Sequence, residues 1–290
     1  MLYDIKLVIR YDYATPAGGG RHLLRLLPAH LPGRQTVRSS ALTIHPQPVE
    51  RRNFTDFFGN AVTELSLPAG HDAVAFEARA VVDRLPQTLP QTDGALADLP
   101  ALLSGYLSIA PDAPHHFLPP SPRIPPDAAI TAFAREAVAG HSGLIAVTEA
   151  LGRALHDTLT FDALATTVDT PPTEAFAKKT GVCQDFAQIM IAGLRGMGVP
   201  AGYVSGYLRT LPPPGQPRLE GADAMHAWVR VWAGPRAGWI DYDPTNACFA
   251  GEDHVTVAHG RDYGDVAPVA GVLRIAGGQS SSQAVDMVAL

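Results

Sequence analysis

Three side chains in the second half of the chain have the types and spacing needed for acyl transfer through a thiol. Cys183 stands in TGVCQDFAQIM, His226 in MHAWVRVW and Asp243 in GWIDYDPTN. A thiol nucleophile needs a base that removes its proton, and the base needs a partner that fixes its tautomer and stabilises its protonated form. The set therefore predicts a Cys-His-Asp catalytic triad in which Cys183 forms a thioester with the acyl group of the substrate.

Cys183 is predicted to begin a helix. The apolar residues around it recur at helical spacing, namely Val182, Phe186, Ile189, Met190, Leu194 and Met197. Free backbone N–H groups in a first helical turn favour a thiolate and can donate to an oxyanion, so we expect the amide of Cys183 to be one donor. Gln184, Tyr203 and Tyr207 are candidates for a side-chain oxyanion donor or for other positions in the cleft.

His226 and Asp243 are predicted to meet across a β-hairpin. Alternation places His226 and Trp228 on one face of the first strand. If Trp232 pairs with Trp239 on the returning strand, the register puts Asp243 beside Trp228, one diagonal step from His226. We therefore expect Asp243 to orient the imidazole, with Trp228 as a candidate wall of the cleft.

Two other residues compete with Asp243 for the orienting role. Asp241 shares its parity but lies beside Arg230, with which it could form a surface ion pair. Asn246 could orient an imidazole through its side-chain amide, as in Cys-His-Asn sites, but Pro244 breaks the strand before it. Asp243 is therefore ranked first and Asn246 second.

Metal binding and disulfide formation are alternative uses of these residues. Thiolate, imidazole and carboxylate groups all ligate zinc, but the triad offers only three ligands and no supporting pair of closely spaced cysteines. The adjacent His115 and His116 lie in a proline-rich stretch, where such residues are more often solvated than ligating. Cys248, the only other cysteine, could form a regulatory disulfide with Cys183. We predict no metal and no cofactor.

Composition excludes several classes of function. The 290 residues include 22 Lys and Arg against 28 Asp and Glu, a formal charge of −6, and 46% are hydrophobic. Such a chain can bury the cores of two domains, and it lacks the basic field that attracts nucleic acid or anionic lipid. The start, MLYDIKLVIRYDY, has no signal-peptide hydrophobic region. We expect a cytoplasmic protein that acts on a peptide or protein, without a nucleic-acid or membrane partner.

The elements around these residues divide the chain at a proline-rich stretch. Period-two alternation predicts an antiparallel β-sandwich-like domain over residues 1–85, with strands at 3–13, 21–27, 41–45, 62–67 and 73–82. Ten of the 26 prolines fall between Leu85 and Asp127, which predicts a connector at 86–126. Residues 127–290 are predicted to form an α+β catalytic domain with a C-terminal strand tail. Asp127 is expected to cap a helix at 128–139, Ser142 to cap a second helix that runs to about 156, and a third helix is expected from Cys183. Its strands are expected at 201–208, 226–232 and 239–243, with a loop at 210–221.

The motifs resemble a known family, the bacterial transglutaminase-like cysteine proteases of the transglutaminase-like superfamily. The segment from TGVCQDF to SGYL resembles the family's nucleophile helix and following strand. DAMHAWVRVW and GWIDYDPTN resemble its histidine and aspartate segments, HGRDYGDVAPVAGV its strand-forming tail, and residues 1–85 its amino-terminal β-rich region. Gln184 departs from the pattern, since a basic residue commonly follows the cysteine. The resemblance implies a papain-like core with Cys183, His226 and Asp243 as triad and no required metal.

Three functions fit these residues. The leading hypothesis is a peptidase or amidase, in which water accepts the acyl group from Cys183 and a peptide, isopeptide or other amide bond is hydrolysed. The first alternative is a protein-glutamine gamma-glutamyltransferase, in which an amine accepts the acyl group of a glutamine side chain at the same catalytic residues, or water deamidates it. The second is a noncatalytic module that binds peptides in the same cleft.

Overall fold

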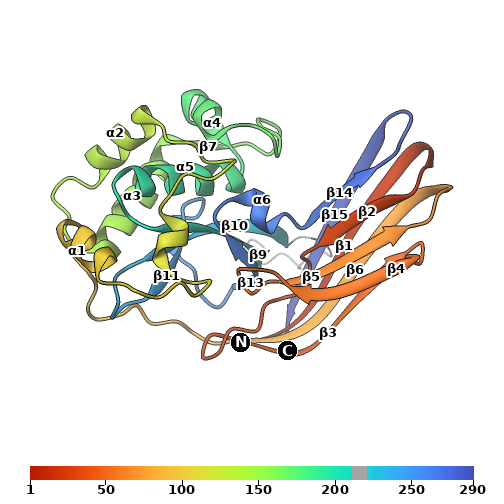
Figure 1. Cartoon of the computed structure of the whole chain (residues 1–290), viewed down its shortest axis with the longest axis horizontal. Coiled ribbons are helices and arrows are strands. Elements are labelled where there is room, and N and C mark those ends of the chain that lie inside the picture. The colour runs from red at the N-terminus through yellow and green to blue at the C-terminus, as the bar shows by residue number, and fades with distance from the viewer. Residues whose placement is uncertain (211–220, 222) are drawn as a thin grey trace, which may run out of the picture.

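The computed structural model describes residues 1–210, 221 and 223–290. Most of the loop expected at 210–221 therefore lies outside the described residues. The helices gather on one side of the molecule and two long β-sheets on the other (Figure 1). The mixed α/β architecture confirms the predicted fold class. Among the described helices, none is long and apolar enough to cross a membrane.

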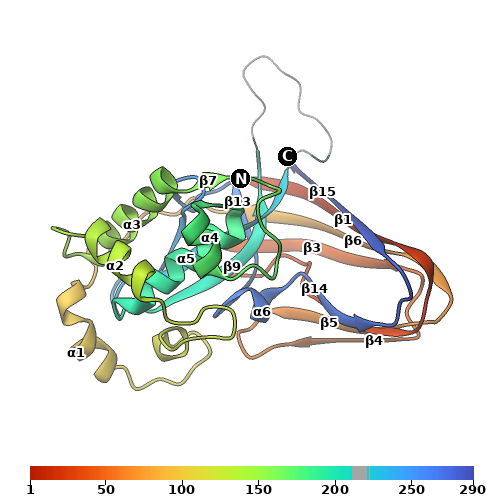
Figure 2. The same ribbon diagram turned by 90° about the horizontal axis from the view of Figure 1, so that it is seen from above.

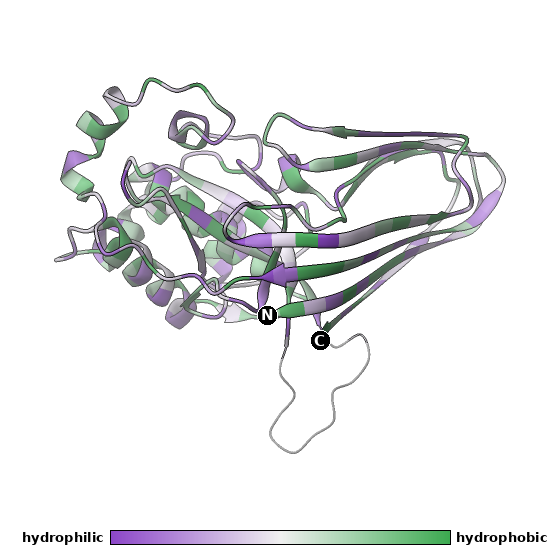
Figure 3. Cartoon of the chain, turned by 90° about the horizontal axis from the view of Figure 1, so that it is seen from below, coloured by the Kyte–Doolittle hydropathy of each residue, from purple (hydrophilic) through white to green (hydrophobic). Residues whose placement is uncertain are grey.

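The long strands form two four-stranded antiparallel sheets in the described part of the chain, here called the β-rich region. Their orders are β15-β1-β6-β3 and β14-β2-β5-β4. The strands are β1 (Leu2–Ala17), β2 (Gly20–Leu24), β3 (Gln35–His45), β4 (Glu50–Thr55), β5 (Ala61–Leu67), β6 (His71–Arg84), β14 (Val269–Leu273) and β15 (Gln279–Ala289). Apolar and polar residues alternate along several of these strands, among them β1 and β6 (Figure 3), and their apolar residues, such as Leu7 and Phe76, are buried.

The C-terminal strands belong to the β-rich region, which differs from the predicted division of the chain. β15 pairs antiparallel with β1 from Tyr3 opposite Ala289 to Tyr13 opposite Gln279, and β14 pairs with β2. The prediction assigned this tail to a catalytic domain at 127–290. A sequence can show that a segment forms a strand, but the partner strand is set by packing in space. Both chain ends consequently lie close together at the β-rich region (Figure 1).

The remaining elements form an α+β core around a sheet of order β12-β11-β10-β9-β13. Its strands are β9 (Ala201–Leu208), β10 (Ala224–Trp232), β11 (Trp239–Asp243), β12 (Cys248–Phe249) and β13 (His254–Gly260), and β7 (Thr160–Phe161) pairs separately with β8 (Thr180–Gly181). The helices are α2 (Ala128–Ala137), α3 (Leu144–Thr158), α4 (Pro172–Lys178), α5 (Cys183–Gly196) and α6 (Tyr263–Val266). α5 packs against β9 and β10, with α2, α3 and α4 on its other sides (Figure 2).

The connector contributes to the core. It contains α1 (Leu99–Ser104) and two short 3-10 turns at Leu96–Asp98 and Pro114–Phe117. Asp127 caps α2 as predicted, since its carboxylate accepts the amide of Ile130 at 2.7 Å. The cap predicted for Ser142 is wrong, because the Asp93 carboxylate of the connector accepts the amide of Ile145 at 2.6 Å. Strand β4 and helix α4 had no clear sequence signal.

Candidate active site

Cys183 is the first residue of α5, as the sequence predicts. The preceding residue, Val182, is extended, and its amide donates to the Asp185 carboxylate at 2.8 Å. The same carboxylate oxygen accepts the hydroxyl of Thr166 at 2.6 Å, and burial raises the pKa of Asp185. These contacts close the first turn of the helix behind the cysteine, so the side chain of Cys183 is held at the wall of a cleft.

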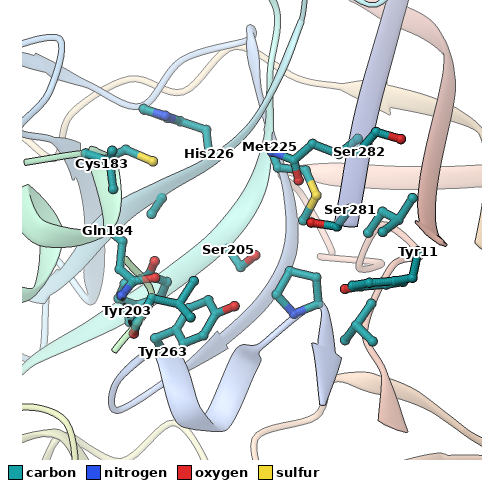
Figure 4. Close-up of a pocket in the computed structure, with 17 residues that line it drawn as sticks. Tyr11, Cys183, Gln184, Tyr203, Ser205, Met225, His226, Tyr263, Ser281 and Ser282 are labelled. Carbon is teal, nitrogen blue, oxygen red and sulfur yellow. Dashed lines mark hydrogen bonds between the residues drawn. The ribbon is translucent and has the colours of Figure 1, made fainter. Parts of the chain in front are cut away.

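His226 and Asp243 meet across the hairpin of β10 and β11. The register places Trp232 opposite Trp239, as predicted, which brings Asp243 diagonally beside His226. His226 Nε2 lies 2.7 Å from Asp243 Oδ2, and both side chains are buried. Nε2 is occupied by the carboxylate, so Nδ1 is the ring atom available to the thiol of Cys183, which interacts with this histidine (Figure 4).

The charges in this pair stabilise each other. Burial is the largest influence on the pKa of His226 and lowers it, but the hydrogen bonds and charges of Asp243 and Cys183 outweigh burial and raise the pKa to about 10. Burial likewise raises the pKa of Asp243, yet donation from His226, His254 and Asn246 holds it well below its usual range. The site therefore favours an imidazolium beside the sulfur, the arrangement that stabilises a thiolate.

His254 on β13 is a part of the site that the sequence analysis missed. Its Nε2 lies 3.1 Å from Asp243 Oδ2, and its Nδ1 accepts the amide of Gly251 at 3.2 Å. Accepting at Nδ1 leaves the hydrogen of the neutral ring on Nε2, where it donates to the carboxylate. β13 pairs with β9 and not with the hairpin. The sequence carried one weak signal, a histidine at the start of the strand-like run HVTVAHG.

The β-rich region holds the strand that carries His254. Arg84 Nε, at the end of β6, donates to the backbone oxygen of His254 at 2.8 Å. Gln35 on β3 accepts the amide of Thr256 at 2.9 Å and donates to its carbonyl at 2.8 Å. Both anchoring side chains are fully buried. The placement of His254 against Asp243 therefore depends on contacts from outside the α+β core.

His226, Asp243 and His254 also offer ligand atoms within 4.8 Å of one another, the spacing of a metal site. Both histidine Nε2 atoms face the same carboxylate oxygen. For His254 to ligate a metal through Nε2, its hydrogen would have to move to Nδ1, which would break the hydrogen bond from Gly251. The donor pattern fits a hydrogen-bonded chain better than a metal-ligand set, and Cys183 is not a member of this group.

The two competing orienters occupy other positions. Asp241 is buried and forms an ion pair with Arg34, so the predicted surface pair with Arg230 is wrong. Arg230 instead lies over the ring of Trp239, 4.2 Å from its centroid. Although Arg230 and Asp241 are opposite each other in the sheet, Arg34 from the β-rich side takes the carboxylate.

Asn246 and Trp228 surround the buried side of the pair. Asn246 Nδ2 donates to Asp243 Oδ2 at 2.7 Å, so its amide supports the carboxylate and not the imidazole of His226. Trp228 is fully buried, with its ring 5.3 Å from that of His254 in an edge-on arrangement. It does not line the cleft described below, and it shields the Asp243 network from solvent.

A cleft of about 470 Å³ opens in front of Cys183 and His226 (Figure 4). Its walls come from the α+β core, including Tyr203 and Ser205, and from the β-rich region, including Tyr11 and Ser281 to Gln283. Of the described side chains that line it, His226 is the one that can carry a positive charge, and none is a carboxylate. The cleft therefore suits an uncharged substrate segment.

The three candidate oxyanion or cleft residues, Gln184, Tyr203 and Tyr207, lie in different environments in the structure. Tyr203 lines the cleft, and burial, followed by the charge of Cys183, raises its pKa well above the usual value, so its hydroxyl stays protonated as a donor. Gln184 also lines the cleft but donates its amide to the Val168 carbonyl at 3.0 Å. Tyr207 is buried elsewhere, with its hydroxyl bonded to the Leu26 carbonyl.

Cys248 lies on β12 opposite Asp243. Burial and the charge of Asp243 raise the pKa of its thiol to about 11. Both cysteines are free. Because thiol–disulfide exchange proceeds through the thiolate, Cys248 is poorly suited to a redox partnership with Cys183.

Two family models match the chain on either side of the connector. Residues 3–83 match the bacterial transglutaminase-like N-terminal region, and residues 131–244 match the transglutaminase-like superfamily. An uncharacterized protein of Mycobacterium tuberculosis is 34% identical over 249 residues, which cover 83% of this chain and 77% of that protein. The chain belongs to the transglutaminase-like superfamily, in the bacterial group that carries this N-terminal region.

Two further proteins are similar to the chain. A crystal structure of a candidate cysteine protease from Cytophaga hutchinsonii superimposes with a TM-score of 0.73 at 20% identity, covering 99% of this chain and 90% of that one, which shows a shared fold. A protein-glutamine gamma-glutamyltransferase of Pseudomonas aeruginosa is 35% identical over 105 residues, which cover 33% of this chain and 16% of that protein.

Proposed function

We propose that the protein is a thiol-dependent acyl-transfer enzyme that hydrolyses peptide, isopeptide or other amide bonds with Cys183, His226 and Asp243 as its catalytic triad. The observation that carries the proposal is the juxtaposition of a cysteine at a helix start with a buried histidine, whose other ring nitrogen lies 2.7 Å from a carboxylate. Cys183 and His226 line a cleft without carboxylate side chains in its described lining, and Asp243 lies buried behind His226.

The first half of the reaction forms a thioester. His226 Nδ1 takes the proton of Cys183, and the sulfur attacks the carbonyl carbon of the substrate. The amide of Cys183 and the hydroxyl of Tyr203 are the donors suited to the oxyanion. As the tetrahedral intermediate collapses, the C–N bond breaks, and the imidazolium returns its proton to the leaving amine. Asp243 holds the ring orientation throughout.

The second half regenerates the enzyme. Neutral His226 takes a proton from water, whose oxygen attacks the thioester carbonyl. The C–S bond then breaks, the imidazolium of His226 returns the proton to the sulfur of Cys183, and the acid product leaves. An amine could replace water at this step without any change in the triad. The similarity to a gamma-glutamyltransferase over 105 residues favours transamidation as the second candidate function.

Product analysis separates the two outcomes. The protein is incubated with a glutamine-containing peptide library and a fluorescent amine, and products are identified by mass spectrometry. Cleaved peptides or free acid without amine incorporation support hydrolysis, whereas covalent incorporation of the amine supports transamidation. Both activities should vanish in Cys183→Ala. A product that forms equally well with this variant rules out the proposed enzyme.

A further inference from the structure

The edge of strand β15 lies beside the cleft that contains Cys183. β15 is the outer strand of its sheet in the described part of the chain, with β1 as its neighbour. Every residue from 279 to 284 is exposed, whereas Val285 and Met287 are buried. Ser281 to Gln283 line the cleft together with the core residues (Figure 4). The strand therefore changes from packed to accessible where it reaches the site.

Three hydrogen bonds show which backbone groups of β15 face away from β1. The amide of Leu290 donates to the Leu2 carbonyl at 2.9 Å, so even-numbered residues of β15 face β1. On the other side, the Val285 carbonyl accepts the amide of Asp223 at 3.2 Å, and the amide of Met287 donates to the Asp223 carboxylate at 2.6 Å. Odd-numbered residues consequently present their N–H and C=O groups outward, as antiparallel pairing requires.

Ser281 and Gln283 follow the same alternation. Their N–H and C=O groups point away from β1 at the level of the cleft, and no described residue hydrogen-bonds to these groups on that side. An edge of this kind is a template for pairing with another extended segment. The outward carbonyl of Val285 and the outward amide of Met287, by contrast, are already bonded to Asp223.

The core strand β10 diverges from β15 at this point. Asp223, just before β10, forms an isolated antiparallel bridge with Val285. Farther along β10, Met225 and His226 line the same cleft as Ser281. The two strands thus touch at one end and separate around the cleft, with the triad on one side and the open edge of β15 on the other.

We propose that the substrate is an extended, uncharged polypeptide segment that adds as a strand to the edge of β15, with backbone hydrogen bonds to Ser281 and Gln283, and so presents its carbonyl to Cys183. This inference rests on the proposed function and names its substrate class. Main-chain pairing would supply affinity with little dependence on sequence. The absence of carboxylates and of Lys or Arg from the described lining disfavours charged side chains beside the cleft.

Proline substitution at outward-facing positions tests the pairing. Gln283→Pro removes an outward N–H without removing a bond to β1, so the sheet should be retained. Gln279→Pro is the matched control, because residue 279 faces outward but does not line the cleft. Two probes are compared, an acetylated uncharged hexapeptide chloromethyl ketone and the acetylated single residue with the same chloromethyl ketone. Iodoacetamide has no peptide backbone that could pair with β15, so it reports the reactivity of the Cys183 thiol without any contribution from strand pairing.

In the parent protein the hexapeptide reagent should label Cys183 about 10-fold faster than the single-residue reagent, which is the gain expected from two backbone hydrogen bonds. Gln283→Pro should abolish that advantage while iodoacetamide labelling is unchanged, and Gln279→Pro should keep it. Equal rates for the two reagents in the parent protein, or an advantage that survives Gln283→Pro, would overturn the inference.

Amide hydrogen exchange tests the edge independently of Cys183 reactivity. The unreactive acetylated hexapeptide amide should slow exchange at Ser281 and Gln283 and leave Gln279 unchanged. If the peptide does not slow amide exchange at Ser281 and Gln283, strand addition is refuted. Slow exchange that is present before peptide is added and that depends on protein concentration also refutes it, because a second copy of the chain would then occupy the edge. Protection together with an unreactive Cys183 would retain the inference and reject the proposed enzyme.

Discussion

Replacing Asp243 with asparagine removes the negative charge on which the site is organised while preserving side-chain size. The carboxylate receives His226, His254 and Asn246 on one oxygen, and backbone amides on the other. It is completely buried, so no solvent replaces it. An asparagine can accept through a single oxygen and adds a donor where donors already converge.

The magnitude follows from the pKa of His226. The ordinary value of 6.5 is raised to about 10, which corresponds to a preference for the imidazolium on the order of 5 kcal/mol, at about 1.4 kcal/mol for each factor of ten. Burial opposes this preference. With the carboxylate gone, burial dominates, and we expect the pKa of His226 to fall below 6.5, so that at pH 6 the ring is largely neutral and no longer stabilises a thiolate.

Alkylation by iodoacetamide at pH 6 measures the change. A free thiol with a pKa of about 8.5 is only about 0.3% ionised at this pH, which leaves room for acceleration. We expect Cys183 in the parent protein to react about 10- to 100-fold faster than a model thiol, and in Asp243→Asn to lose that advantage.

Asp241→Asn is the matched control, because Asp241 is a buried carboxylate on the same strand that pairs with Arg34 instead of His226. Thermal unfolding of both variants establishes that each is folded at the assay temperature. Asp241→Asn should retain fast labelling. If Asp243→Asn labels as fast as the parent protein, or if only Asp241→Asn loses labelling, the assignment of the orienting carboxylate is refuted.

Three further results are expected. His254→Phe should lower kcat/KM about 10-fold, in line with loss of a hydrogen bond to a charged group, and should slow iodoacetamide labelling of Cys183 at pH 6. His254→Gln should restore part of both rates. Equal rates for the parent protein and the two variants would exclude a positioning role for His254. Tyr203→Phe should reduce kcat on the order of 100-fold at similar KM, whereas Tyr207→Phe should not; the reverse order would exchange their roles. The lowered pKa of Asp243 stabilises the fold above about pH 4, the usual Asp range, and this stabilisation is lost as the pH falls. The raised pKa of His226 stabilises the fold below about pH 6.5, and this stabilisation is lost as the pH rises toward about 10. Thermal unfolding of Asp243→Asn should therefore vary less with pH than that of the parent protein, and superimposable profiles would contradict the coupling.

The parts of the site that the sequence could predict are those fixed by local pattern. The apolar period after Cys183 indicates a helix that begins at the cysteine, and the register of one short hairpin follows from two tryptophans at its turn. Period-two alternation is similarly local, which is why most strands of the β-rich region are recognisable.

The parts that escaped prediction depend on pairing between distant segments. His254 reaches Asp243 because β13 pairs with β9 and is anchored by the buried Arg84 of the β-rich region. The pairing of β15 with β1 has the same character. Tyr203 and Tyr207 lie an even number of residues apart on β9, so alternation places them on the same face. Tyr203 nevertheless lines the cleft, whereas the hydroxyl of Tyr207 donates to the Leu26 carbonyl, a difference that alternation alone cannot reveal.

Detection of a covalent acyl-enzyme is the most direct test of thiol-dependent acyl transfer. The protein is mixed with the peptide library, quenched in acid within a turnover, and analysed by intact mass and peptide mapping. We expect an acyl adduct on Cys183 that hydroxylamine removes, as is typical of a thioester, and that is absent from Cys183→Ala. Turnover that forms no adduct on Cys183 and persists in Cys183→Ala would contradict thiol-dependent acyl transfer.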